Sequence, residues 1–273
     1  MGGVESRRSI QKDPLEIQSR GHYFKLWKWE PGGTTLHRKF AFNLDFRDFK
    51  DFFDEIDAHF ANHSARLQLI SLLIAYTNAP SFSSAAKILS KHSLMLNLLY
   101  SLFLDNSSTA ATLGVTLLVK ILPFLAVYTR EDLSPMLPKL FAILARIMCW
   151  KERPASKSLG DATDVDFERE LEYETNPVLG VNPDLKWDRL EMSFHAAASL
   201  PPSSRNYFTM LYYLYPANLL KFLRYPSLYL VDSGTPSPYR ESWEQAFDEG
   251  QIHRRSEVRP HGIGCFLILI LDS

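Results

Sequence analysis

Apolar side chains recur every three or four residues along most of this chain, beginning near residue 43. That spacing places them along one face of an α-helix, whereas a half-buried strand would alternate apolar and polar positions. Turn-forming residues divide the pattern into helices of roughly 12–18 residues joined by short connections. The pattern therefore predicts an all-α protein.

An aromatic stripe marks the first predicted helix, for which Asn43 is a suitable N-terminal cap. Acidic residues occupy the other faces of this helix, which makes it amphipathic. Packing into a core explains the stripe, and a cofactor slot is the alternative. Its members are Phe46, Phe49, Phe53, Ile56 and Phe60.

Capping and turn signals predict the helices that follow. We expect a helix from near Ser64 to just before Asn78 and another from the serines at 81–84, with a bend around Ser90. The turn at 105–108 should cap a helix that Pro123 ends or kinks. The next helix should start within 130–135 and reach Trp150. The apolar run 111–127 contains Lys120 and Pro123 and is short for a membrane span, so a buried helix is expected.

Helix pairs recur loosely about every 35–45 residues, as they do in HEAT and armadillo repeats. We therefore predict an irregular α-solenoid of HEAT/armadillo-like helix pairs, with a compact helical bundle as the alternative. The helical domain should span residues 43–260. A polar tail and an aromatic segment, hairpin or extended, precede it at 1–42. An apolar tail at 261–273 follows, which we interpret as a truncated domain edge or a non-native ending.

An acidic segment at 151–183 interrupts the helical pattern. We expect a solvated loop there, with an acidic docking site for a basic partner as the alternative. Helical spacing resumes at Asp184, and a surface helix is expected after Ser242. The members of one face of the helix from Asp184 are Trp187, Leu190, Phe194 and Ala197.

The segment Leu211–Arg224 reads LYYLYPANLLKFLR and is the most distinctive in the chain. Helical spacing places Asn218 and Phe222 on a buried face, while Pro216 should kink or break the helix. We interpret the segment as a structural joint without catalytic chemistry. Its motif residues are Leu211, Tyr212, Tyr215, Pro216, Asn218, Phe222, Leu223 and Arg224.

Composition favours a globular protein, because hydrophobic residues make up 46% and charged residues 22% of 273. The only two cysteines, Cys149 and Cys265, are far apart in sequence, so we expect a cytoplasmic protein without disulfides. Cys149 lies in an apolar run where a buried, reduced thiol is usual, and a formal charge of −1 gives no general attraction to nucleic acid. His59 and His63 are four apart but lack the pattern of a metal site. No catalytic, cofactor-binding or metal-binding residues are predicted.

The Leu211–Arg224 motif resembles the end of the N-terminal helical domain in the hamartin family, the tuberous sclerosis scaffold proteins. Its fungal members are the most similar, and the likeness extends over residues 64–224. The resemblance implies a HEAT-like solenoid and a non-enzymatic scaffold. Hamartin acts with tuberin, whose GTPase-activating domain acts on Rheb, and the complex restrains TOR signalling at the lysosome or vacuole.

The resemblance also implies protein partners, a tuberin-like subunit first among them. The coiled coil that mainly binds tuberin in the family has no counterpart in these 273 residues, since no heptad pattern is sustained. Peripheral contact with the lysosomal or vacuolar membrane is a further expectation. The alternative function is a helical-repeat adaptor for membrane or trafficking partners, which would share only the architecture.

Overall fold

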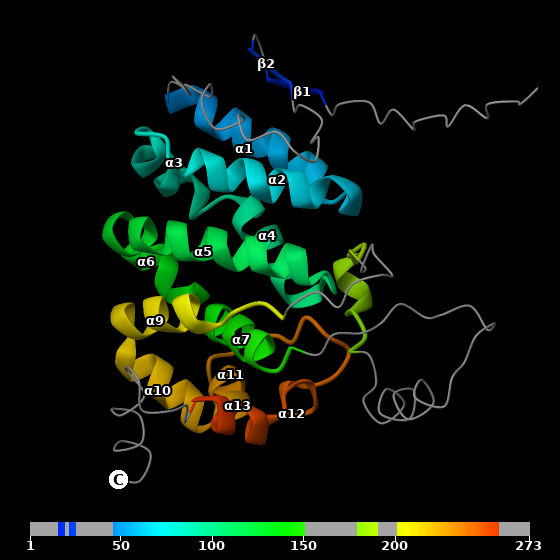
Figure 1. The fold of residues 1–273 in the computed structure, drawn as a ribbon, viewed down its shortest axis with the longest axis vertical. Coiled ribbons are helices and arrows are strands. Elements are labelled where there is room, and N and C mark those ends of the chain that lie inside the picture. The colour runs from blue at the N-terminus through cyan, green and yellow to red at the C-terminus, as the bar shows by residue number, and fades with distance from the viewer. Residues whose placement is uncertain (1–15, 20–21, 26–45, 151–178, 191–200, 257–273) are drawn as a thin grey trace, which may run out of the picture.

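A computed structural model describes residues 16–19, 22–25, 46–150, 179–190 and 201–256. Its helices lie in successive layers along the long axis of the molecule, from α1 at one end to α10–α13 at the other (Figure 1). The N-terminal helices are α1 (Phe46–Phe60), α2 (His63–Tyr76), α3 (Phe82–Leu89), α4 (Ser93–Leu104), α5 (Ser108–Tyr128), α6 (Arg130–Leu133) and α7 (Leu137–Met148). The C-terminal helices are α9 (Arg205–Leu214), α10 (Pro216–Arg224), α11 (Pro226–Asp232), α12 (Trp243–Ala246) and α13 (Glu249–Ser256).

Each layer packs on the next, which is the arrangement of a solenoid. Helix α1 contacts α2, α3 and α4, and α5 contacts α2, α3, α4 and α9. Helix α7 then joins α4 to α11 and α13, while α10 contacts α9, α11 and α13. The predicted irregular α-solenoid is confirmed, because contacts link neighbouring layers instead of converging on one central bundle axis (Figure 1).

A two-stranded hairpin precedes the helices. Strand β1 (Glu16–Ser19) pairs antiparallel with β2 (His22–Lys25), so that Glu16 lies opposite Lys25, and β1 contacts α1. The sequence pattern predicts a polar tail over residues 1–20 and a hairpin or extended segment only after it, so the assignment of residues 16–19 to the tail was wrong. Pairing with β2 gives this polar segment a structure that its own hydrophobic pattern does not indicate.

The aromatic stripe of α1 belongs to the core from Phe49 onward, as predicted, while the side chain of Phe46 lies outside the described residues. Phe49, Phe53, Ile56 and Phe60 are buried, and Phe52 joins them. The Phe52 ring lies 5.0 Å from that of Tyr76 on α2, with the two rings close to edge-on. The buried face is wider than the predicted stripe because α1 packs against more than one helix.

Helix α5 crosses the middle of the stack and does not end at Pro123. By length and composition it could cross a membrane, but half of its apolar window is buried within the fold. Beyond Pro123, the Phe124 ring packs 5.1 Å from that of Phe82 and Leu125 is fully buried. This packing offsets the backbone hydrogen bond that proline removes, so the helix continues to Tyr128.

The break predicted at Pro216 is present. Helix α9 ends at Leu214, Tyr215 has φ −143° and ψ 60°, and Pro216 is the first residue of α10. Proline fits there because the first helical N–H has no intrahelical partner. Asn218 is exposed, whereas Phe222 is buried, so the predicted burial of Asn218 was wrong. The non-helical Tyr215 resets the helical phase, and α10 buries Leu219, Phe222 and Leu223 instead.

Two more predicted helices differ from the structure. Residues 184–190 hold only the end of a short 3₁₀ turn, Pro183–Leu185, and Lys186 then adopts a left-handed φ of 46°. After Ser242 the chain forms two short helices, α12 and α13, separated at Phe247. Trp243, Phe247 and Ile252 are buried, so this region belongs to the core as well as to the surface.

Several sequence predictions lie outside the described residues. They concern the cap at Asn43, the acidic segment as far as residue 178, the face positions Phe194 and Ala197, and the apolar tail at 261–273.

Candidate functional site

A buried ion pair joins the N-terminal and central layers. Arg66 lies in the first turns of α2, and Asp105 is the residue that follows α4. Nη1 of Arg66 donates to Oδ1 of Asp105 at 2.6 Å, and the two side chains are 0% and 1% exposed. Because water cannot solvate these charges, each must be satisfied by the other and by further hydrogen bonds.

Arg66 also binds the end of α1. Its Nε donates to the carbonyl of Phe60 at 3.1 Å, and Nη2 donates to the carbonyls of Ala61 and Asp188. Carbonyls at a helix C-terminus lack intrahelical donors and carry partial negative charge, so a guanidinium there both caps the helix and complements its dipole. One side chain thus fixes α1 to α2.

Asp105 accepts hydrogen bonds from the segment that follows the acidic residues in the sequence. Trp187 Nε1 donates to Oδ1 at 3.1 Å, and the Leu190 backbone N–H donates to the same atom at 3.0 Å. The Trp187 ring also lies over the Arg66 guanidinium, 4.3 Å from its carbon. These contacts favour the irregular backbone at 187–190 and explain why the predicted helix is not present there.

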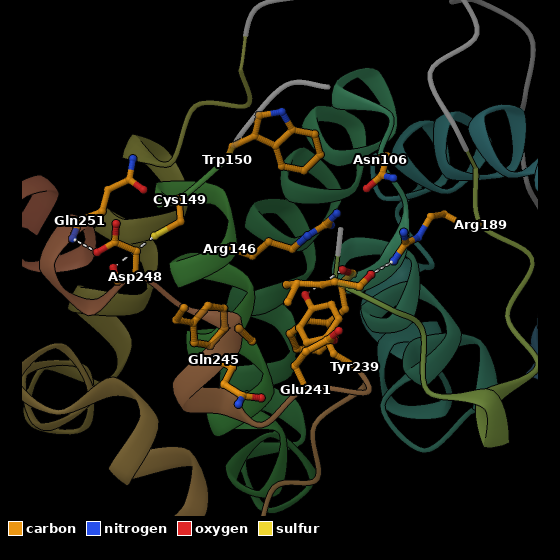
Figure 2. Close-up of a pocket in the computed structure, with 14 residues that line it drawn as sticks. Asn106, Arg146, Cys149, Trp150, Arg189, Tyr239, Glu241, Gln245, Asp248 and Gln251 are labelled. Carbon is orange, nitrogen blue, oxygen red and sulfur yellow. Dashed lines mark hydrogen bonds between the residues drawn. The ribbon is translucent and has the colours of Figure 1, made fainter. Parts of the chain in front are cut away.

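A pocket of about 600 Å³ lies next in the chain to this ion pair, because Asn106, the neighbour of Asp105, is part of its lining (Figure 2). It lies between the ends of α4 and α7, the segment 179–190, and the region of α12 and α13. Its volume falls within the usual range for ligand sites, about 300–1,000 Å³. The lining combines aromatic walls with charged and amide side chains, as small-ligand and peptide pockets do.

Two arginines approach the same part of the pocket from different elements (Figure 2). Arg146 on α7 donates to the carbonyls of Leu102 and Asp105, the second at 2.6 Å, and lies over the Trp150 ring. Arg189 donates from Nη2 to the carbonyl of Leu179 at 2.8 Å. Backbone carbonyls therefore hold both guanidinium groups in place.

The Tyr239 side chain lies near both Arg146 and Arg189. Its hydroxyl donates to the carbonyl of Phe103 at 2.9 Å, and the side chain is buried. Burial raises the pKa of Tyr239, while Arg146 and Arg189 lower it by smaller amounts. Tyr239 therefore remains protonated at neutral pH, as a hydrogen-bond donor between two cations.

Two carboxylates also line the pocket, and the charge of Glu241 reaches Tyr239 as well. Glu241 accepts the Gly180 N–H through both oxygens, at 3.1 and 3.3 Å. A side chain at Gly180 would place its Cβ 2.8 Å from Cδ of Arg240, so glycine allows this close approach. Asp248 accepts the Gln251 N–H at 2.9 Å and lies across the pocket from Arg189 (Figure 2).

The part of the chain that the structure describes contains no group of three His, Cys, Asp or Glu side chains placed to hold a metal ion. His59 contacts Glu55, whereas His63 contacts Asp188 at 2.5 Å, so the two histidines pair with different carboxylates. Cys149 is only half-buried, contrary to the expected burial, and its Sγ donates to the carbonyl of Asp248 at 3.7 Å.

The Leu211–Arg224 motif and the pocket are separate features. The motif side chains Leu211, Phe222 and Leu223 are buried in the core, and no motif residue lines the pocket. The pocket residues Arg146 and Arg189 were missed from the sequence. No local sequence pattern marks this pair, because the two arginines are 43 residues apart in the chain.

An exposed apolar row provides a second surface feature. Tyr225, Leu228 and Val231 are 58%, 55% and 57% exposed, and they recur every third residue on and just before α11. Side chains at that spacing lie on one side of a helix. Apolar rows of this kind are typical of surfaces that contact other molecules.

The stacked helices define the class of the protein as an α-solenoid, and solved structures of similar fold are known. One, "Structure of TSC1 NTD and linker domain", has 23% sequence identity and a TM-score of 0.50, with 81% of this chain and 45% of that chain covered. Another, "TSC1 N-terminal domain", has 22% identity and a TM-score of 0.49, with 81% and 47% covered.

TSC1 is hamartin, so the expected resemblance is confirmed at the level of the fold. This chain spans about half the length of the hamartin chains it matches. No family model matches the sequence. No curated protein matches it either.

Proposed function

We propose that this chain is a non-enzymatic scaffold that acts as hamartin does. It would contact a tuberin-like subunit whose GTPase-activating domain acts on Rheb, and so restrain TOR signalling. The observation that carries the proposal is the layered stack of helices, whose fold is shared with the hamartin N-terminal domain at a TM-score of 0.50.

The surface of the stack supports a role in protein binding. Solenoids offer long continuous faces on which partners dock without any catalytic group. The exposed row Tyr225, Leu228 and Val231 gives one such face apolar character. Since no heptad pattern is sustained in the chain, the contact proposed here is made by the helical surface itself.

Co-expression with a tuberin-like subunit tests this proposal. We expect the two chains to co-elute in size-exclusion chromatography at a light-scattering mass equal to their complex. Separate elution at micromolar concentration would overturn the proposed contact. Flotation of the chain alone with liposomes, without binding to that subunit, would favour the membrane or trafficking adaptor instead.

Paired variants examine the apolar row. Leu228→Glu with Val231→Glu adds two charges to α11 and is expected to weaken co-elution. Ser71→Glu with Thr116→Glu adds the same charge at two exposed polar positions on α2 and α5 and should leave co-elution unchanged.

We also propose a cytoplasmic location with peripheral contact at the lysosomal or vacuolar membrane, which fluorescence microscopy of the tagged protein tests.

A further inference from the structure

The guanidinium of Arg189 has fewer hydrogen bonds than it can make. Nη2 donates to the carbonyl of Leu179, but Nε is buried without a hydrogen-bond partner in the described part of the chain. The ion pairs among the described residues do not include Arg189 either. A buried donor without an acceptor is destabilising, so an added acceptor at this position would be favourable.

The surroundings of Arg189 favour an anion as that acceptor. The Arg146 guanidinium points toward the same end of the pocket (Figure 2), and both cations act on the Tyr239 hydroxyl between them. Two guanidinium groups facing one space repel each other, and a negative group between them relieves that repulsion. The Tyr239 side chain lies at this arginine end of the pocket as well.

The charge of the lining favours a carboxylate over a dianionic phosphate. Glu241 and Asp248 also line the pocket, so its formal charge balances the two arginines. Glu241 acts on Tyr239 at the arginine end, so a ligand with two negative charges would meet more repulsion there than a single carboxylate. Asp248 lies across the pocket from Arg189 (Figure 2). The planar arginine fork also matches the geometry of a carboxylate.

The remaining walls suit a peptide better than a free carboxylic acid. Trp150 supplies aromatic surface next to Arg146, and Phe103 and Phe247 add to the aromatic lining. Gln245 and Gln251 supply amide groups that can bind a peptide backbone. Aromatic walls with a few convergent polar groups are typical of pockets that orient a side chain.

We propose that this pocket receives an aspartate or glutamate side chain from a peptide segment of a protein partner, with its carboxylate at Arg189 and Arg146. The inference rests on the proposed scaffold function and deepens it by naming the chemistry of one partner contact. It is independent of tuberin, because any partner with an exposed acidic segment can supply the group.

¹H–¹⁵N correlation NMR of the ¹⁵N-labelled chain tests the proposal, with N-acetyl-Phe-Glu-amide as the probe. We expect saturable shifts of the Arg189 Nε–H and Trp150 indole N–H resonances, and at least tenfold weaker apparent affinity for N-acetyl-Phe-Gln-amide. Arg189→Gln should abolish the response. Arg130→Gln removes one charge at an exposed site on α6 and should retain it.

Several results would overturn the proposal. Equal affinity for the two peptides would show that the carboxylate is not recognised, and tighter binding of inorganic phosphate would contradict the charge argument. If Arg189→Gln melts at the wild-type temperature and still binds, the site is elsewhere. If amide substitutions in the chain's own acidic residues 161–174 shift the Arg189 resonance of the peptide-free protein, the carboxylate comes from this chain and not from a partner. None of these results alters co-elution with a tuberin-like subunit, so failure here is distinguishable from failure of the scaffold function.

Discussion

Arg66 and Asp105 form a 2.6 Å ion pair with almost no exposure to solvent, and three segments distant in sequence meet at it. Arg66 binds the carbonyls at the end of α1, while Asp105 accepts from Trp187 and from the backbone of Leu190. The pocket begins at the next residue, Asn106, and Arg146 in its lining donates to the carbonyl of Asp105. This pair therefore holds together the layers that present the pocket.

Replacing Arg66 with methionine should destabilise the fold strongly. The substitution keeps much of the side-chain volume but leaves Asp105 buried without its counter-charge, which typically costs about 3–5 kcal/mol. Urea denaturation followed by circular dichroism measures the change in unfolding free energy. Lys50→Met is the control, because Lys50 and Asp54 form a solvent-exposed pair at 2.7 Å whose loss should change the unfolding free energy little. Equal losses for the two variants would contradict the role of the Arg66–Asp105 pair.

Phe222→Ala should destabilise the fold strongly and Asn218→Leu should hardly change its stability, although the two residues lie one helical turn apart. Phe222 is fully buried, with its ring 5.5 Å from that of Phe141, and its truncation should cost about 3–5 kcal/mol. Asn218 is exposed, so its replacement should change stability by no more than about 0.5 kcal/mol. Thermal melts of both variants check this, and a large loss for Asn218→Leu would show that α10 is rotated relative to this description.

Gly114→Ala tests how closely α5 approaches α4. A Cβ at Gly114 would lie 2.7 Å from Cδ2 of the buried Leu102, so we expect overpacking that costs about 1–3 kcal/mol. Gly250→Ala is a matched control in α13, where the nearest atoms would lie at an ordinary 3.4 Å. There the higher helix propensity of alanine should leave stability equal or raise it, by up to about 1 kcal/mol. Chemical denaturation compares the two, and equal values would contradict the close approach.

Asp54 should make a small, pH-dependent contribution to stability. Hydrogen bonds from Lys50, and then from His92, hold the pKa of Asp54 below its usual 3.8. Because the folded-state pKa is the lower one, the contribution is present at neutral pH and is lost as the pH falls below 3.8 toward the folded-state value. The melting temperature of Asp54→Asn should thus fall below wild type at pH 7 and approach it near pH 3.

The matched variant for this titration is Asp51→Asn, at an exposed position one turn earlier in α1. Among the described residues Asp51 has no side-chain hydrogen bond like those of Asp54, so Asp51→Asn is the control for a charge lost from the same helix without loss of such bonds. A difference between Asp54→Asn and wild type that stays constant from pH 7 to pH 3 would refute the linkage.

Local patterns allowed much of the helical core to be predicted. The stripe of α1 and the cap at Ser107, which accepts the Ala110 N–H, depend on residues within a few positions of each other. The break at Pro216 is equally local, because proline at a first helical position is a property of one residue. These signals persist because the neighbouring layers bury the same faces that the sequence pattern marks.

Contacts between distant segments explain what the sequence analysis missed. Asp105 binds Arg66 and Leu190 across separations of 39 and 85 residues, and no periodicity reports such a contact. Arg146 and Arg189 share a pocket for the same reason. Asn218 was misplaced because one non-helical residue, Tyr215, changes the direction of every side chain after it. Tertiary packing, not propensity, decides the positions of Asp105, Arg146 and Arg189, whereas the error at Asn218 comes from a local change of backbone conformation.

The most direct test of the scaffold function is GTP hydrolysis by Rheb, measured in single turnover with this chain alone, with a tuberin-like subunit alone, and with both. We expect the chain alone to leave the intrinsic rate unchanged, and the pair to hydrolyse GTP at least as fast as the tuberin-like subunit while co-eluting with it. Acceleration by the chain alone, or a pair that neither co-elutes nor differs from the subunit alone, would contradict the account.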